Sequence, residues 1–304
     1  MHESTAAQPR ASAPGASTSF LDELRTEGWC IIRDALPIAA ITDLEADLSP
    51  YFEHTLFSEG GFYGERTKRF GRLLARSDHA AALVQHAAIL SLAESVLLPW
   101  CDCIQLNLTQ ATEIHSGAQA QYPHRDQDMW QGVKGEVEYL VNVMWPMSPF
   151  TEENGATLIY PRSHGTEALR QGASGQAVAA TCDPGSAIVF LGSTLHGAGS
   201  NRTQTPRRGI IVSYALGWLK PYENQWLAYP PAVARRFSAD LAALVGYRQH
   251  RPNLGNIEGL CPSTLLMGGL PRRRGAVDAL RPEQESMLAD YINAQHCGDP
   301  LGAS

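Results

Sequence analysis

The stretch at residues 183–201 reads DPGSAIVFLGSTLHGAGSN and decides the class of fold. A tight turn at Pro184 and Gly185 leads into an apolar run, 186–191, that is typical of a buried β-strand. The strand delivers His196 to a glycine-rich corner. A buried histidine often bonds only a backbone carbonyl, but the small residues on both sides of His196 leave room for an ion and its other ligands. We therefore take His196 as a candidate metal ligand.

Similar short runs, separated by turn sequences, fill the middle of the chain. We expect strands at 29–33, 101–114, 122–126, 137–147, 156–160, 177–182, 186–191 and 207–218. Helices are expected at 21–27, 37–51, 80–98 and 281–295, and the stretch 55–77 is loop-like. Helices followed by a series of short strands predict a mainly β fold with flanking helices, arranged as a sandwich or jelly roll.

Length and composition fit one large domain. The chain has 304 residues, of which 44% are hydrophobic and 18% charged. Residues 1–19 are small and polar, so we expect a disordered N-terminal tail followed by a single domain at 20–304. The most apolar segment, 80–98, is interrupted by polar residues and followed by Pro99. We therefore expect an amphipathic helix there and no membrane partner.

Charge and cysteine content restrict the partners and the compartment. The net charge of −7 argues against a nucleic-acid partner, because binding to phosphates needs a basic stripe. The six cysteines include no C-x-x-C pair, and reduced thiols are the simplest interpretation. No targeting segment is evident, so we expect a cytoplasmic location.

Two further candidate ligands lie in the triplet His124-Arg125-Asp126. Alternate side chains of a β-strand share a face, so His124 and Asp126 could hold one ion from one strand. With His196 they form a set of two histidines and one carboxylate, the facial arrangement of non-haem Fe(II) oxygenases. An H-x-D triplet is also common in solvated loops, and Asp128 shares the parity of Asp126 and is a rival ligand.

Two adjacent arginines, Arg207 and Arg208, begin the next apolar strand. An arginine at the start of a strand is most often surface charge. Beside a metal-bound 2-oxo acid, however, a guanidinium would clamp the free carboxylate in a bidentate fork. The two side chains must leave the strand on opposite faces, and the apolar pattern that follows allows either one to lie inside.

Taken together, these motifs resemble the phytanoyl-CoA dioxygenase family of Fe(II)- and 2-oxoglutarate-dependent oxygenases. The likeness starts near Phe20 and fades after about Tyr247. It is carried by segments 27–34, 122–126, 153–157, 161–164, 184–186, 196–201 and 207–209. The run GWLKPYENQ at 217–225 is similar to the microbial natural-product branch of the family. Arg162 departs from the glycine that the family often has before Ser-His.

The resemblance implies a double-stranded β-helix, which is a cupin-like jelly roll. It makes His124, Asp126 and His196 the iron ligands and the catalytic centre. The separation of Arg207 from His196 also matches the family, which makes Arg207 the anchor for 2-oxoglutarate.

The resemblance also implies that Thr157 and Trp145 line the cosubstrate pocket. With Fe(II), 2-oxoglutarate and O2, the implied dioxygenase reaction oxidises a small-molecule substrate, most simply by hydroxylation in secondary metabolism, and releases succinate and CO2. The alternatives are a jelly-roll protein that binds metal without redox turnover, as a sensor or store, and a cupin-type metal-dependent hydrolase or isomerase. The latter needs a placed general base and no oxo-acid anchor. The sequence specifies neither the substrate nor the oligomeric state.

Overall fold

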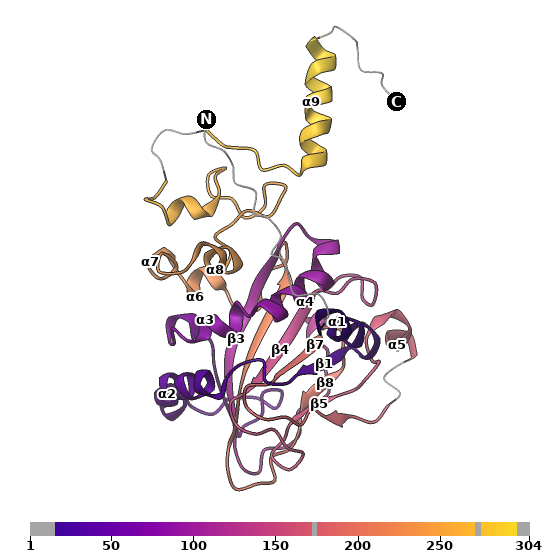
Figure 1. The fold of residues 1–304 in the computed structure, drawn as a ribbon, viewed down its shortest axis with the longest axis vertical. Coiled ribbons are helices and arrows are strands. Elements are labelled where there is room, and N and C mark those ends of the chain that lie inside the picture. Colours follow the sequence, from indigo (N-terminus) through magenta and orange to yellow (C-terminus); the bar gives the residue numbers. More distant parts are fainter. Residues whose placement is uncertain (1–15, 172–174, 271–274, 297–304) are drawn as a thin grey trace.

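The computed structural model describes residues 16–171, 175–270 and 275–296, which form two antiparallel β-sheets flanked by helices (Figure 1). Within these residues the larger sheet has six strands in the order β1-β7-β4-β9-β3-β2, and the smaller has three in the order β6-β5-β8. This architecture confirms the prediction of a mainly β fold with flanking helices. The strands are β1 Trp29–Ile32, β2 Thr67–Phe70, β3 Ile104–Ile114, β4 Leu140–Pro146, β5 Thr157–Ile159, β6 Val178–Ala179, β7 Ala187–Leu191, β8 His196–Ala198 and β9 Arg207–Leu216.

Helices cover one face of the larger sheet. α4 (Ala87–Leu97) packs on β3, β4 and β9, and α1 (Ala16–Glu27) packs on β1, β7 and α4. α2 (Ile38–His54) buries one stripe of residues at helical spacing, Ile41, Leu44, Leu48 and Phe52. The other helices are α3 Ala80–Val84, α5 Gly165–Gln171, α6 Gln225–Ala228, α7 Pro231–Ala234, α8 Ala239–Leu244 and α9 Pro282–His296, with 3-10 turns η1 Leu73–Ala75, η2 Leu98–Trp100, η3 Asp126–Met129 and η4 Pro262–Leu265.

The larger sheet separates two apolar cores. Every residue of β4 is buried, because helices cover one face of this strand and the smaller sheet covers the other. Val143 and Trp145 belong to the core under the helices, whereas Met144 belongs to the core between the sheets. The alternation of side chains along the strand thus decides which residues can reach a site between the two sheets.

The predicted strands are present with shorter ends, except at 122–126. There the structure has a single bridge at His124, followed by the 3-10 turn η3. The stretch 55–77, predicted to be loop-like, contains β2, which pairs with β3. Of the predicted disordered tail at 1–19, residues 1–15 lie outside the described residues, and 16–19 instead begin α1.

The predicted helix 80–98 is broken into α3 and α4. The backbone of His86, between the two helices, is extended and therefore interrupts the helix. Nε2 of His86 donates to the Ala35 carbonyl at 3.0 Å, and its ring lies 5.5 Å from the ring of Trp145. By length and mean hydropathy (1.6), the segment Ala80–Trp100 alone among the described residues could cross a membrane. In the fold its α4 part packs on the larger sheet, which accounts for its apolar side chains.

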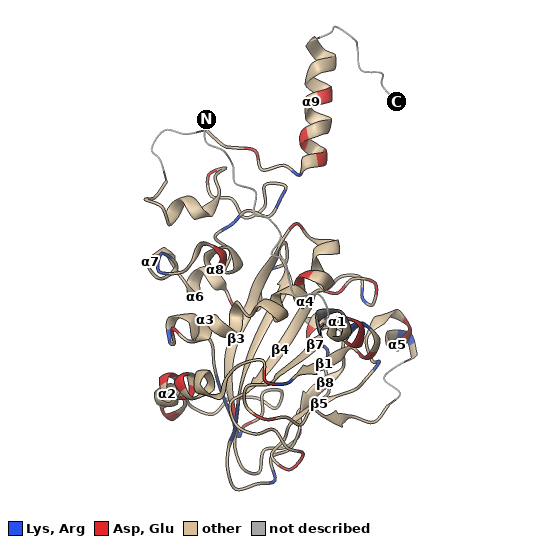
Figure 2. Cartoon of the chain, viewed as in Figure 1, with Lys and Arg blue, Asp and Glu red and all other residues tan. Residues whose placement is uncertain are grey.

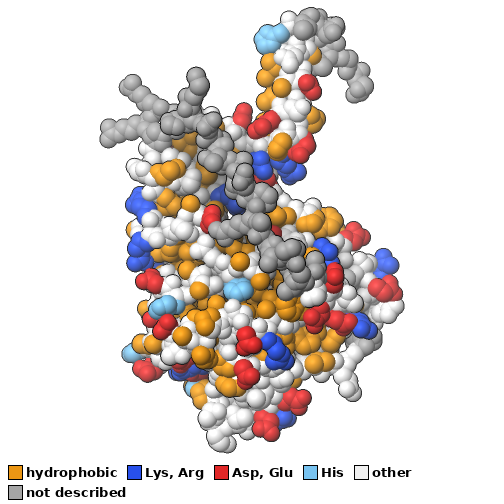
Figure 3. Space-filling view, in the orientation of Figure 1, with side chains coloured by type: hydrophobic (Ala, Val, Ile, Leu, Met, Phe, Trp, Pro, Cys, Tyr) orange, Lys and Arg blue, Asp and Glu red, His pale blue; other side chains and the backbone are white. Residues whose placement is uncertain are grey.

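The helix predicted at 281–295 is present as α9, which projects from the rest of the described chain (Figure 1). None of its residues is buried. Acidic side chains lie along it (Figure 2), and apolar ones are exposed on it (Figure 3), among them Met287 and Tyr291. It lies far from the site described next.

Candidate metal centre

His124 and His196 face each other across neighbouring backbone segments. The two residues form an antiparallel bridge in which His124 N donates to His196 O at 2.9 Å and His196 N donates to His124 O at 3.0 Å. Glycine at 197 permits this close approach, because a Cβ there would lie 3.1 Å from the Gln121 carbonyl oxygen. The bridge places the two imidazole rings 4.5 Å apart.

Each imidazole is oriented by the carbonyl two residues earlier in the chain. Nδ1 of His124 donates to Tyr122 O at 2.9 Å, and Nδ1 of His196 donates to Thr194 O at 3.0 Å. A hydrogen on Nδ1 leaves the lone pair of a neutral imidazole on Nε2. Both Nε2 atoms are therefore preset as ligand atoms, as in metal centres where the second ring nitrogen is hydrogen-bonded.

Asp126 completes the cluster from the first residue of η3. One carboxylate oxygen lies 3.4 Å from His124 Nε2 and the other 3.7 Å from His196 Nε2. The three ligand atoms lie within 4.8 Å of one another. This set of two nitrogens and one oxygen, open on one side to a pocket, has the chemistry of the facial triad that binds Fe(II).

Burial and charge together keep the cluster suited to a cation. Burial acts to raise the pKa of Asp126, but His196 and His124 outweigh it and hold this pKa below its ordinary value. Burial lowers the pKa of His196, whereas for His124 the hydrogen bond and charge of Asp126 outweigh burial and raise the pKa. A charged carboxylate beside a neutral imidazole is the protonation state that metal binding needs.

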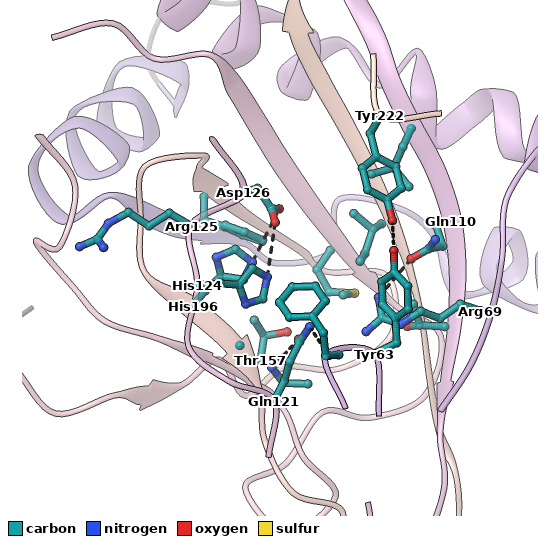
Figure 4. A pocket seen from close by; sticks show the side chains of 18 of the residues that line it. Tyr63, Arg69, Gln110, Gln121, His124, Arg125, Asp126, Thr157, His196 and Tyr222 are labelled. Carbon is teal, nitrogen blue, oxygen red and sulfur yellow. Dashed lines mark hydrogen bonds and ion pairs between the residues drawn. The ribbon is translucent and has the colours of Figure 1, made fainter. Parts of the chain in front are cut away.

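A pocket of about 370 Å³ opens beside the cluster, between the two sheets (Figure 4). Its wall is made from both sheets, the loop before β2 and the segment after β9. The lining residues are Phe62, Tyr63, Arg69, Leu108, Gln110, Thr112, Ile114, Gln121, His124, Arg125, Asp126, Asp128, Met129, Met144, Thr157, Phe190, His196, Gly197, Ala198, Arg207, Ile211 and Tyr222.

Arg207 lines this pocket as an uncompensated buried cation. Its exposure is 2%, and its Nε and Nη1 have no hydrogen-bond partner. Its guanidinium lies 4.1 Å from the centre of the Phe150 ring. Gly209 leaves the space that this ring occupies, because a Cβ at residue 209 would lie 2.9 Å from the ring. Burial, together with the charge of Arg69, lowers the pKa of Arg207 to about 9. A buried, unpaired guanidinium is a site for a carboxylate.

Arg69 is a second pocket cation, and the sequence reasoning missed it. It comes from β2, where its partner in the β3 register is Thr112. Nη1 donates to Gln110 Oε1 at 3.1 Å, while Nε has no partner. Burial lowers the pKa of Arg69. Two arginines facing one pocket give it an excess of positive charge that a dianion could compensate.

Of the two residues expected to line the cosubstrate pocket, only Thr157 does so. Trp145 lies on the other face of β4, fully buried in the core under the helices, and Met144 faces the pocket in its place. The expectation that Trp145 lines the pocket is therefore wrong, and its neighbour Met144 is the lining residue. The reason is strand parity, which is hard to read from a strand whose one polar residue is Asn142, on the same face as Met144.

The structure separates the remaining candidates. Arg208 leaves β9 on the face opposite Arg207 and pairs with Glu45 and Glu113. Asp128, the rival ligand, is outside the three-residue cluster and pairs with Lys134 at 2.5 Å. Of the two adjacent arginines, Arg207 is therefore the one in the pocket, and Asp126 is the carboxylate in the cluster.

Comparison with known proteins gives a consistent result. The family model of phytanoyl-CoA dioxygenase (PhyH) matches residues 24–209. Dioxygenase FrzG of Cladobotryum sp is 32% identical over 208 residues, covering 62% of this chain and 67% of that protein. Dioxygenase olcK of Penicillium canescens is 27% identical over 245 residues, covering 76% and 81%.

Solved structures of two other proteins have a similar fold. The non-heme α-ketoglutarate-dependent epimerase SnoN from nogalamycin biosynthesis has a TM-score of 0.59 at 19% identity, covering 69% of this chain and 87% of that one. HygX from Streptomyces hygroscopicus, with nickel and 2-oxoglutarate bound, has a TM-score of 0.52 at 14% identity, covering 67% and 89%. These likenesses confirm the predicted jelly-roll fold.

Proposed function

The chain belongs to the phytanoyl-CoA dioxygenase family of Fe(II)- and 2-oxoglutarate-dependent oxygenases, and we propose that it hydroxylates a small molecule in secondary metabolism, releasing succinate and CO2. The observation that carries the proposal is the cluster of His124, Asp126 and His196 beside the unpaired, buried Arg207 in one pocket. A metal site alone does not need this cation, whereas a metal site with a 2-oxo dicarboxylate does.

The protein part of the proposed mechanism is to hold and orient. His124 and His196 present Nε2 and Asp126 presents its carboxylate to Fe(II). When bound, iron and 2-oxoglutarate supply the oxidative decarboxylation that activates O2. Phe190 and Phe62 place their rings 4.5 and 4.8 Å from the two imidazoles, and these apolar rings keep water away from the ligand atoms.

The cosubstrate site is proposed on the side of the pocket where positive charge is uncompensated. Arg207 would hold the carboxylate far from the metal in a bidentate fork. Thr157 lies on β5 beside the metal-ligand strand β8, in register with Ala198, and supplies a hydroxyl to the same pocket. Arg69 adds a second guanidinium to the same pocket, so the carboxylate of 2-oxoglutarate far from the metal would lie in a region of positive charge.

The alternatives account for less of the site. A metal-binding sensor or store leaves the burial of Arg207 unexplained. A cupin-type hydrolase or isomerase needs a free general base in the pocket, and the carboxylate next to the cluster, Asp128, is paired with Lys134. The origin of SnoN in nogalamycin biosynthesis supports a role in secondary metabolism. A cytoplasmic location is also proposed, on the cysteine pattern.

Anaerobic titration tests this proposal. Fe(II) is added to the purified protein, then 2-oxoglutarate, and the visible spectrum is followed. A weak charge-transfer band that saturates with 2-oxoglutarate is expected, and succinate, which lacks the 2-oxo group, should produce none. A protein that binds Fe(II) but gives no band with 2-oxoglutarate would be a metal-binding protein of another class.

A further inference from the structure

Two tyrosines meet in the pocket on the side away from the metal cluster. Tyr63 lies in the loop before β2 and Tyr222 follows β9, yet their hydroxyl groups hydrogen-bond to each other (Figure 4). Tyr63 is 37% exposed and Tyr222 44% exposed, so the pair borders both the pocket and solvent. The bond therefore joins two segments at the entrance to the site.

The pair has one hydroxyl hydrogen to spare. Two phenols carry two hydrogens, and their mutual hydrogen bond uses one of them. Among the described residues, neither hydroxyl has another hydrogen-bond partner. Burial, then the hydrogen bond with Tyr63, raises the pKa of Tyr222, so this hydroxyl keeps its hydrogen at neutral pH. Because hydrogen-bonded hydroxyls polarise each other, the spare O–H is a good donor.

The charged groups around the pair have other partners. Arg69 and Arg207 are assigned to the cosubstrate, and Asp128 is paired with Lys134. Arg125 donates to the carbonyls of Ser193 and Ser163 at 2.9 and 3.0 Å, and its guanidinium points away from the pocket (Figure 4).

What remains of the pocket wall is neutral. Four apolar side chains make up much of it, namely Phe62, Leu108, Met129 and Ile211. With the cosubstrate in place, this wall offers apolar contact, the phenolic donor and the polar side chains of Gln110, Gln121 and Thr112, and it offers no free cation.

We propose that the primary substrate is an uncharged, mainly apolar molecule with a carbonyl, ether or hydroxyl oxygen that accepts the spare hydrogen of the Tyr63–Tyr222 pair. This inference rests on the proposed function, because it assigns both pocket arginines to 2-oxoglutarate. An anionic substrate, such as a coenzyme A thioester, would meet an apolar wall without a compensating charge. Tyr63 and Tyr222 are then specificity-determining residues.

Three naphthalene probes of similar shape test the proposal. 2-Acetylnaphthalene has a carbonyl acceptor, 2-ethylnaphthalene has none, and 2-naphthoate is an anion. Dissociation constants are measured by equilibrium dialysis on the anaerobic protein saturated with Fe(II) and 2-oxoglutarate, for the wild type and the double variant Tyr63→Phe/Tyr222→Phe. The wild type should prefer the ketone over the ethyl compound by about 3- to 10-fold, as one hydrogen bond provides. The naphthoate should bind at least as weakly as the ethyl compound.

The double variant keeps both rings, including the stacking of Tyr63 on Arg69 at 5.1 Å, and should lose the preference for the ketone. The matched control is Tyr51→Phe: Tyr51 is also 37% exposed and stacks on Arg76 at 4.8 Å, but lies outside the pocket, so the preference should persist. The proposal is overturned if naphthoate binds as well as the ketone, if the preference survives in the double variant, or if none of the probes binds. The 2-oxoglutarate band separates the two proposals, because its presence in the wild type upholds the proposed function whatever the probes do.

Discussion

His124 and His196 occupy directly opposite positions and exchange both of their backbone hydrogen bonds, at 2.9 and 3.0 Å. Their Nδ1 atoms are bonded in the same way, each to the carbonyl two residues earlier. The relative position of the two nitrogen ligands is therefore set by the backbone rather than by flexible side chains. A site held in this way is preorganised for an ion.

Replacement of either histidine should remove the metal. His124→Ala or His196→Ala is expected to weaken Fe(II) or Co(II) binding by more than about 100-fold, because loss of an outer hydrogen bond to a ligand alone costs about 10–100-fold. Calorimetric titration with Co(II) measures this. His54→Ala, at an exposed helix end away from the pocket, is the control and should bind as the wild type does. Unchanged affinity in either ligand variant would contradict the assignment.

Arg125 should act as a positioning residue for the same site. It lies between His124 and Asp126 in sequence, and its guanidinium donates to the carbonyls of Ser193 and Ser163. Ser193 precedes His196 by three residues, and the hydroxyl of Ser163 accepts from Leu195 N at 2.8 Å. Arg125→Gln is expected to weaken Co(II) binding about 10-fold and to alter the visible spectrum of bound Co(II). Arg162→Gln, an exposed arginine in the neighbouring loop, should leave both unchanged. Equal effects of the two variants would make Arg125 merely structural.

The three residues of the cluster could be predicted because short motifs carry them. The reason given for Asp126 was nevertheless incomplete, since it reaches the cluster from a 3-10 turn and not from a continuous strand. Most predicted strands also lie where the turn sequences placed them, but β2 and β8 were not predicted. The sequence motifs therefore identify the three residues of the cluster. They do not show the bridge between His124 and His196 that fixes the positions of these residues, because the two segments are distant in sequence.

Two pocket residues could not be predicted from sequence for different reasons. Arg69 lies in a stretch without apolar alternation, and only the pairing of β2 with β3 brings it to the pocket. Met144 and Trp145 are neighbours on a strand that is buried throughout and apolar except for Asn142, and one polar residue is too little alternation to show which of the two points inward. Both cases depend on the register of a sheet, which short motifs do not contain.

Glu138 should make stability depend on pH. Burial raises its pKa to about 7, although Ser193 donates hydrogen bonds to it. The folded state then holds this proton more tightly than the unfolded chain does, so the free energy of unfolding falls as pH rises from about 4.5 to about 7. Glu138→Gln should remove this loss. The change that it causes in the free energy of unfolding should therefore be more favourable at pH 8 than at pH 5, by about 1–3 kcal/mol. Urea denaturation at both pH values measures it, with the exposed Glu136→Gln as control; a gain at pH 5 alone would contradict the sign.

The adjacent arginines Arg207 and Arg208 should give opposite results when replaced. Arg207 is buried and lacks partners at Nε and Nη1, whereas Arg208 bonds to Glu45 and to the buried Glu113. Arg207→Ala is therefore expected to weaken 2-oxoglutarate binding by at least about 100-fold, because removing one partner of a buried charge pair costs about 3–5 kcal/mol. Iron should still bind, since the ligands are untouched.

Arg208→Ala should leave 2-oxoglutarate affinity within a few-fold of the wild type and instead lower the melting temperature. The reason is that Glu113 loses its bond to Arg208 and, among the described residues, keeps His115 at 2.7 Å and Lys68 at 3.9 Å. Outward-facing Arg208 is thus more than surface charge. Titration of the charge-transfer band gives the affinities, and calorimetry without cosubstrate gives the melting temperatures. In that state Arg207→Ala should lower the melting temperature less than Arg208→Ala does, because it removes a desolvated charge with no carboxylate beside it. If Arg208→Ala instead abolished 2-oxoglutarate binding and Arg207→Ala only lowered the melting temperature, β9 would have the opposite register and Arg208 would be the anchor.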